Sequence, residues 1–272
     1  MTRSILTFSI VVLLLGCETK KTNLILIGTV HEPMENFNPD SLYAILEHVK
    51  PDVILYELDS SFFDEDFSFN RELSSNEFIA TTRYVENHGI TVRPYDFTGR
   101  NEHRIKIGSR PTDGNVHRLL DSLLSNGLMP ANHHSTYSSF NQINDSLIAR
   151  AYGTAESFNN VKTDSISQLR QQLQYEALND VVRAIPLFSE MYHLLPSGDS
   201  ITYLEGYERA ADFWHLRNQT MATNILKFID VYNGKTIVVL NGFFHRYYLN
   251  LELRPLQESM RFQIHEFYNY KK

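Results

Sequence analysis

The chain has 272 residues, of which 42% are hydrophobic and 21% charged, a composition typical of a globular protein rather than a disordered or fibrous one. Its formal charge is -7, from 25 basic and 32 acidic residues, and no Lys/Arg-rich run occurs, so nucleic acid is not an expected partner. The single cysteine excludes an internal disulfide, a zinc ribbon and a Cys-x-x-Cys redox site.

That cysteine, Cys17, directly follows an apolar N-terminal run. The run is too short for a permanent transmembrane helix but suits the central region of a secretory signal. The Leu-Leu-Gly-Cys motif that ends at Cys17 resembles a bacterial lipobox, in which the cysteine is lipidated and becomes the new N-terminus. We therefore predict a lipoprotein signal peptide over 1–16, a tether over 17–23 and an exported, membrane-anchored domain over 24–272, on the periplasmic side or at the cell surface. An uncleaved anchor with a free thiol is the alternative.

The first part of the body alternates between strands and helices. Continuous apolar runs predict strands that are buried on both faces. Asn38 with Pro39 opens the first helix, and Ser74 with Glu77 fits a capping box for the second. In chain order the elements are a strand at 24–27, a helix at 38–50, a strand at 53–56, a helix at 74–87 and a strand at 91–95. This order predicts right-handed crossovers and an α/β fold with a mixed, largely parallel central sheet flanked by helices.

The middle of the chain, from about 116 to 195, is expected to be a helical insertion, because apolar residues repeat there at helical spacing. Within it, the polar and poorly patterned stretch 135–144 is expected to be a loop. A long helix from about 201 to 232 follows, and then a fourth buried strand at 236–240. The tail at 260–270 alternates roughly between apolar and polar residues, which predicts an edge strand.

The first and fourth predicted strands both end in a Gly-x-x-His pattern, one closing at His31 and the other at His245. Glycine lets the backbone turn tightly, and the carboxyl ends of strands in an open α/β sheet are where ligands bind. Glu57 ends the second strand, and Asp96 follows the third. Two neutral imidazoles and a carboxylate are the donors of a metal half-site, and Asp96 is a secondary candidate.

Each of these residues also has a structural interpretation. A strand-end histidine is more often a hydrogen-bonded structural residue, and a carboxylate after a strand is more often a cap for the next helix, a role that suits Asp59 and Asp96. The recurrence of one tetrapeptide pattern after two similar strands favours a functional site instead.

Arg217 lies within an apolar stripe of the long helix, three residues after Trp214. A guanidinium directed into a packed face needs an anionic partner, because an unpaired buried charge is very costly. Arg217 either pairs structurally or lines the crevice, where it would orient Glu57 or hold an anionic substrate group.

In this order and spacing, the two Gly-x-x-His patterns, Glu57 and Arg217 resemble the TraB/Tiki superfamily. That group includes the TraB/GumN-like proteins, the Tiki proteases and, more distantly, erythromycin esterases and the haem-binding lipoprotein ChaN. The resemblance covers about residues 24–250 and implies a single α/β domain with a divalent-metal site, manganese or cobalt being the expected ion. His31 and His245 would be ligands, Glu57 a ligand or the general base on a metal-bound water, and Arg217 would stabilise negative charge. Erythromycin-esterase-like members are instead thought to use histidine without metal.

The leading functional hypothesis is therefore a membrane-tethered hydrolase, peptidase-like, that acts on a peptide or small-molecule substrate. The alternative is a non-catalytic lipoprotein that binds a ligand such as haem, for which we expect a wide aromatic cleft with one His or Tyr at its mouth. A scaffold without chemistry would instead bury Glu57 and Arg217 as a closed ion pair with no cavity. No particular oligomeric state is predicted.

Overall fold

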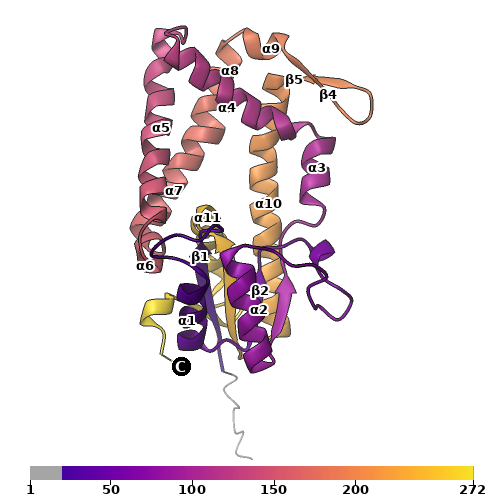
Figure 1. Cartoon of the computed structure of the whole chain (residues 1–272), viewed down its shortest axis with the longest axis vertical. Helices are drawn as coiled ribbons and strands as arrows, with labels where there is room; N and C mark the ends of the chain where they lie inside the picture. The colour runs from indigo at the N-terminus through magenta and orange to yellow at the C-terminus, as the bar shows by residue number, and fades with distance from the viewer. Residues whose placement is uncertain (1–19, 272) are drawn as a thin grey trace, which may run out of the picture.

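The computed structural model describes residues 20–271 (Figure 1). Its strands are β1 (Thr22–Thr29), β2 (Val53–Tyr56), β3 (Thr91–Pro94), β4 (Tyr192–Leu194), β5 (Ser200–Thr202), β6 (Thr236–Gly242) and β7 (Phe262–His265). Five of them form a central sheet in the order β3-β2-β6-β1-β7, and the α/β fold class is as predicted. Every pair in this sheet is parallel, so the sheet is all-parallel rather than mixed. β4 and β5 form a separate antiparallel hairpin.

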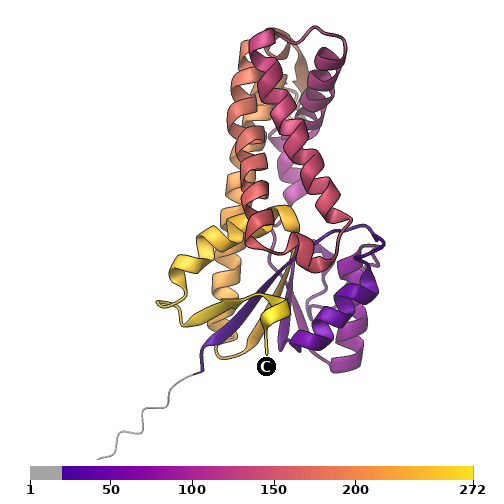
Figure 2. The ribbon, with the colours of Figure 1, turned by 90° about the vertical axis from the view of Figure 1, so that its left-hand side faces the viewer.

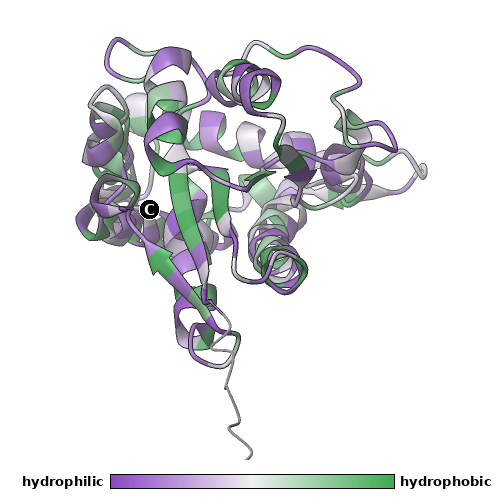
Figure 3. Ribbon diagram, turned by 90° about the horizontal axis from the view of Figure 1, so that it is seen from below, coloured by the Kyte–Doolittle hydropathy of each residue, from purple (hydrophilic) through white to green (hydrophobic). Residues whose placement is uncertain are grey.

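Helices cover both faces of the sheet. Figure 3 shows these helices around strands that are coloured mostly as hydrophobic. The covering helices are α1 (Pro39–Val49) and α2 (Asn76–His88) on one face, and α10 (Tyr203–Val231) and α11 (Phe243–Leu253) on the other. Successive side chains of β1 point to opposite faces, so Ile25 packs with the α1 and α2 side while Leu24 packs with α10 and α11. This burial on two faces explains the unbroken apolar run of β1.

Of the two helix starts predicted from capping residues, that of α1 is confirmed and that of α2 is wrong. Asn38 caps α1 through a capping box with Ser41, so that start is confirmed. α2 instead begins at Asn76 with Ser75 as its N-cap, and the expected Ser74–Glu77 capping box is wrong. The physical reason is that Glu77 is buried, 1% exposed, and faces the end of β1 rather than its own helix start.

The middle of the chain forms a helical layer above the sheet, which we call the arm (residues 109–190; Figures 1 and 2). Its elements, with the short helix α3 that precedes it, are α3 (Arg100–Lys106), α4 (Ser109–Ser125), α5 (Ala131–Ala151), α6 (Ala155–Phe158), α7 (Val161–Gln172), the π-helix η2 (Leu173–Ala177), α8 (Leu178–Ala184) and α9 (Leu187–Glu190). The loop expected at 135–144 is wrong, since those residues lie inside α5. Tyr137 and Phe140 are buried there in the arm's own core, so tertiary packing outweighs the weak apolar pattern.

At the two ends of the described chain, the strands begin and end near the predicted positions. β1 starts at Thr22, two residues inside the predicted tether, and β7 is the expected edge strand, followed by a short 3-10 helix at Phe267–Asn269. The predicted signal peptide and Cys17 lie outside the described residues. Among residues 20–271, no helix combines the length and hydropathy needed to cross a bilayer.

Candidate functional site

The strand ends bring four of the predicted site residues to one edge of the sheet. β1 and β6 pair in parallel with Thr29 opposite Gly242, so the two Gly-x-x-His patterns run side by side. Glu57 extends β2 next to β6, where its backbone N–H donates to Leu240 O at 3.1 Å. All these carboxyl ends point towards the arm (Figure 1). The sheet topology therefore supplies the convergence that the strand-end pattern predicted.

Arg217, at the middle of α10, joins two of these carboxylates. Its Nη2 lies 2.5 Å from Glu57 Oε1, and its Nε and Nη2 donate to Asp96 at 2.8 and 2.9 Å. The side chains of Glu57, Arg217 and Asp96 are 6, 10 and 1% exposed. Burial acts to lower the pKa of Arg217, but the charges and hydrogen bonds of Glu57 and Asp96 outweigh it and raise that pKa above its ordinary value. The guanidinium is a fixed cation that orients Glu57.

His245 is buried in the first turn of α11 and lies against Arg217. Its Nε2 is 3.0 Å from Arg217 Nη1, its Nδ1 is 2.7 Å from Asn218 Oδ1, and its ring stacks on Trp214 with centroids 4.5 Å apart. Because a guanidinium only donates, Nε2 accepts and the Nδ1 hydrogen is donated to Asn218. Burial, and then the charge of Arg217, hold the pKa of His245 well below its usual range. His245 is thus a neutral imidazole inside a closed network.

His31 is exposed and differs from His245 in charge. Its Nδ1 lies 2.7 Å from Glu77 Oε1, and Thr29 Oγ1 donates to the same carboxylate oxygen. The hydrogen bond to Glu77 is the largest cause that raises the pKa of His31 to about 9. Burial alone would raise the pKa of Glu77, but the hydrogen bond and charge of His31 lower it overall. The two side chains form an imidazolium–carboxylate pair with the ring 61% exposed.

Glu77 is the site residue that sequence reasoning missed. Its position two residues after Ser75 is typical of a helix-start acid, which hides its second role. The signal that could have identified it is the helical spacing of Glu77 with Thr81 and Tyr84, since all three lie on the buried face of α2. Asn76 beside it donates to Val30 O at 2.7 Å, which holds the loop that carries the His31 ring.

Gly242 keeps a space open between His31 and Glu57. A Cβ built on Gly242 would lie 3.3 Å from His31 Nε2 and 3.7 Å from Glu57 Oε2. The Gly242 N–H also donates to Glu57 Oε2 at 2.6 Å. The Nε2 of His31 and one oxygen of Glu57 therefore both lie within 4 Å of the position that the missing Cβ would take, which we call the gap.

The donor set does not fit a divalent metal in this arrangement. The lone pair of His245 Nε2 already accepts from Arg217, and the same guanidinium bonds Glu57, so a cation lies between two of the three expected ligands. Among residues 20–271, no group of three His, Cys, Asp or Glu side chains is placed to hold one ion. A metal would have to displace Arg217 from both partners, and the manganese or cobalt site stays a prediction.

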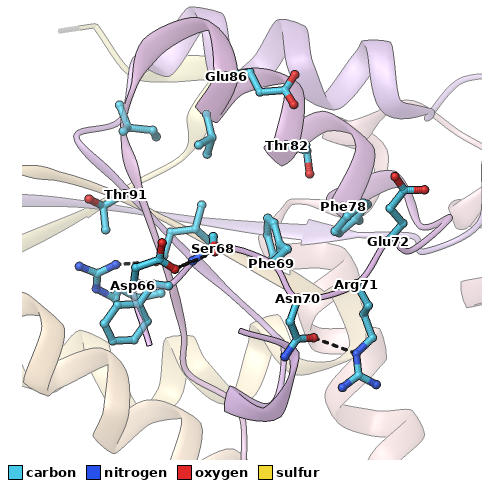
Figure 4. A pocket seen from close by; sticks show the side chains of 15 residues that line it. Asp66, Ser68, Phe69, Asn70, Arg71, Glu72, Phe78, Thr82, Glu86 and Thr91 are labelled. Atoms are coloured by element: carbon cyan, nitrogen blue, oxygen red, sulfur yellow. Dashed lines mark hydrogen bonds between the residues drawn. The ribbon is translucent and has the colours of Figure 1, made fainter. Parts of the chain in front are cut away.

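Two cavities bear on the two alternatives to a hydrolase, namely a scaffold with a closed Glu57–Arg217 pair and a lipoprotein that binds a ligand such as haem. A cavity of about 150 Å³ adjoins Arg217, so the buried Glu57–Arg217 pair is not a closed pair without a cavity. A larger hollow, about 680 Å³, lies elsewhere, between the loop at 66–72, α2 and the edge strand β3 (Figure 4). Aromatic rings such as Phe69 and Phe78 line it, but its lining includes no His, Tyr, Cys or Met that could bind haem iron.

Asp59 has the capping role that was expected of it, because its carboxylate accepts the Ser61 N–H at 2.9 Å and also the N–H of Gly99 before α3. Asp96 accepts the next N–H, from Phe97, at 2.7 Å, but it is buried and bonds Arg217 as well. It belongs to the site rather than to a helix start alone. No protein-family model, curated protein or solved structure matches this chain.

Proposed function

We propose that the chain is a hydrolase in which His31 and Glu57 act as an acid–base pair on a substrate held in the gap beside Gly242. The observation that supports this most is that His31 Nε2 and Glu57 Oε2 lie 3.3 and 3.7 Å from the position that a Gly242 Cβ would take. Each is held from behind by an oppositely charged partner, Glu77 for His31 and Arg217 for Glu57. Two titratable groups in contrasting environments are typical of acid–base catalysis.

In this proposal, Glu57 Oε2 accepts a proton from a water that attacks the scissile carbonyl. The His31 imidazolium donates its Nε2 proton to the leaving group as the carbon–heteroatom bond breaks. Solvent then reprotonates His31, and Glu57 releases its proton, which restores the starting charges. Arg217 and His245 are positioning residues, because they hold Glu57 through the buried network and do not face the gap.

The substrate class follows from the same residues. Acid–base hydrolysis of this kind suits an ester or an amide, so a peptide or a small-molecule substrate is proposed, in keeping with the TraB/Tiki resemblance. The lipobox-like Cys17 makes the proposed enzyme a membrane-tethered one. Dependence on manganese or cobalt is a separate prediction, which the hydrolysis assay described next also tests.

The test is a hydrolysis screen of the full-length chain in detergent with chromogenic esters and peptide amides, repeated with His31→Gln and Glu57→Gln. Each variant is expected to lose about a hundredfold or more in kcat, because each removes one proton-transfer partner. His134→Gln, at an exposed histidine on α5, serves as the matched control and should retain full activity. Full activity in His31→Gln would contradict the proposal.

Chelation separates the two mechanisms. Treatment with EDTA should leave the acid–base enzyme active. Loss of activity that manganese or cobalt restores would instead support the metal site, with Arg217 displaced from His245 and Glu57.

A further inference from the structure

The 150 Å³ cavity beside Arg217 is lined chiefly by cationic and aromatic side chains. Of the eight residues around it, three are arginines and one is an acid. They come from four elements, since the lining consists of Arg100 and Arg104 on α3, Asp113 on α4, Tyr175 on η2, and Ala210, Phe213, Trp214 and Arg217 on α10. Asp96 and Glu57 pair with Arg100 and Arg217 from outside the lining, so the wall itself presents more cationic than anionic groups to the cavity, which makes it a candidate anion site.

Two of the arginines have donors to spare. Arg100 donates to Asp96 at 3.1 Å, and Arg104 donates to Asp113 at 2.6 Å. A guanidinium carries five N–H groups, so these bonds within the described chain use only part of what each side chain offers. Arg100 and Arg104 are 35 and 28% exposed, which lets a ligand reach them from solvent. Guanidinium forks match the geometry of carboxylate and phosphate oxygens.

The cavity and the acid–base gap share one side chain. Arg217 lines the cavity and at the same time bonds Glu57. Trp214, one turn earlier on α10, also lines the cavity and stacks on His245. A group bound in the cavity therefore lies next to the network that holds Glu57, and a substrate that fills both would have its scissile bond close to its anionic end.

We propose that this cavity binds an anionic group of the substrate, a carboxylate or a phosphate, through Arg100 and Arg104. The volume of about 150 Å³ suits one such group with few further atoms, while the stacked rings of Tyr175 and Trp214 form an apolar wall beside it. The inference that an anion binds here is drawn from the cavity alone. The inference that this anion is part of the substrate rests on the proposed hydrolase function.

Trp214 supplies a direct readout, because it is the single tryptophan of the chain. We would titrate the full-length protein with inorganic phosphate and, separately, with acetate, against chloride at equal ionic strength, and follow tryptophan fluorescence. A saturable change with either oxyanion supports the proposal, and the tighter one identifies the ligand class. If neither oxyanion gives a saturable change, the proposal fails.

Two variants are expected to change the anion affinity in opposite directions, which a general loss of folding could not do. Arg104→Gln should weaken the affinity about tenfold, because it removes a charged fork. Asp113→Asn should tighten it several-fold, because it frees Arg104 from its partner. The control is Arg83→Gln on the exposed surface of α2, where Arg83 pairs with Asp40 of α1. This variant should bind the oxyanions as the wild type does. Equal affinity in Arg104→Gln and the wild type would overturn the assignment.

The catalytic proposal can fail independently of this one. His31→Gln should bind phosphate or acetate with unchanged affinity, since His31 does not line the cavity. Normal anion binding combined with full hydrolysis by His31→Gln would disprove the acid–base mechanism and leave the anion site intact.

Discussion

Gly28 and Gly242 begin the same Gly-x-x-His pattern, but a methyl group added at each would meet different neighbours. At Gly28 it would lie 2.9 Å from the Cβ and 3.0 Å from the Cα of Phe243, where backbone must shift. At Gly242 it would enter the gap between His31 and Glu57, and the backbone φ of -53° is one that alanine adopts freely.

These neighbours predict opposite phenotypes. Gly28→Ala should destabilise the fold by about 1–3 kcal/mol through overpacking, measured by urea unfolding. Gly242→Ala should unfold close to the wild-type midpoint but lose about tenfold or more in kcat, because reacting groups tolerate little displacement. A Gly242→Ala variant with full activity would show that substrate does not use the gap.

The raised pKa of His31, about 9, comes mainly from Glu77, with a smaller contribution from the charge of Glu57. Glu77→Gln should therefore move the His31 titration down towards its ordinary value of 6.5, as followed by NMR of the ring. A raised histidine pKa stabilises the fold fully below 6.5, and that contribution is lost as the pH rises through 9. The stability gap between wild type and Glu77→Gln should therefore be larger at pH 6 than at pH 10.

Glu47→Gln is the matched control for that experiment, since it removes a surface carboxylate paired with His88 instead. It should leave the His31 titration unchanged. A His31 titration that stays near 9 in Glu77→Gln would place the source of the shift elsewhere.

At the scale of single residues, the position of a side chain at a strand end predicted that it would lie in the site. The site residue that lies on a helix facing the sheet, Glu77, depends on how that helix packs. His31, Glu57, Asp96 and His245 could be predicted because parallel strands deliver their carboxyl ends to one edge. The partner of Arg217 could be narrowed to an acid at that edge. Glu77 was not assigned, because an acid near a helix start is typical of a cap, and only its helical spacing with Thr81 and Tyr84 indicates the buried face.

Among the elements, the end of β1 depends on the side chain of Asn159, which directly follows α6. β7 pairs with β1 only as far as Ile25, so beyond that point β1 has no strand on this side. Asn159 takes that place: its Oδ1 accepts the Gly28 N–H at 2.6 Å, and its Nδ2 donates to Gly28 O at 2.9 Å. The side chain is fully buried, so no solvent can replace it.

Asn159→Ala should therefore destabilise the fold by about 2–4 kcal/mol, since it leaves two buried backbone groups without partners. Asn160→Ala, at the next residue, removes the N-cap of α7 and two hydrogen bonds to the carbonyls of Glu156 and Ser157. These groups lie nearer to solvent, so the change should cost about 1 kcal/mol. Urea unfolding of both variants checks the difference. Equal losses would mean that Gly28 finds other partners.

Element boundaries followed the sequence where the apolar pattern was strong. β1, β2 and β6 contain unbroken apolar runs, and their identity as buried strands could be predicted from that alone. Residues 135–144 could not be placed in a helix, because α5 buries only a few of its side chains against the arm and its surface is polar. The order of the strands in the sheet comes from long-range pairing, which local pattern does not encode.

For the molecule as a whole, one buried arginine joins the arm to the sheet layer. Arg246 on α11 is 1% exposed and pairs with Asp164 on α7, with Glu266 at 2.5 Å, and with Leu26 O at 3.3 Å. Arg246→Met should cost about 3–5 kcal/mol, because two carboxylates lose their counter-charge in a buried place. Arg183→Met, which breaks an exposed pair, should cost about 1 kcal/mol or less in the same urea titration.

A smaller loss in Arg246→Met than in Arg183→Met would mean that the pairs of Arg246 add little to the stability of the fold. The expected result is one shared unfolding transition, since the Arg246–Asp164 pair joins α11 to the arm while the Glu266 pair holds Arg246 within the sheet layer.

The direction of β1 has a consequence for how a tethered molecule would meet its substrate. The described chain enters β1 at Thr22, and the acid–base gap lies past the opposite end of that strand, eight residues or about 26 Å further on. If Cys17 is lipidated as predicted, the proposed site would face the aqueous compartment, with the arm beyond it. Substrates would then arrive by diffusion through water, and molecules dissolved in the bilayer would be poor candidates.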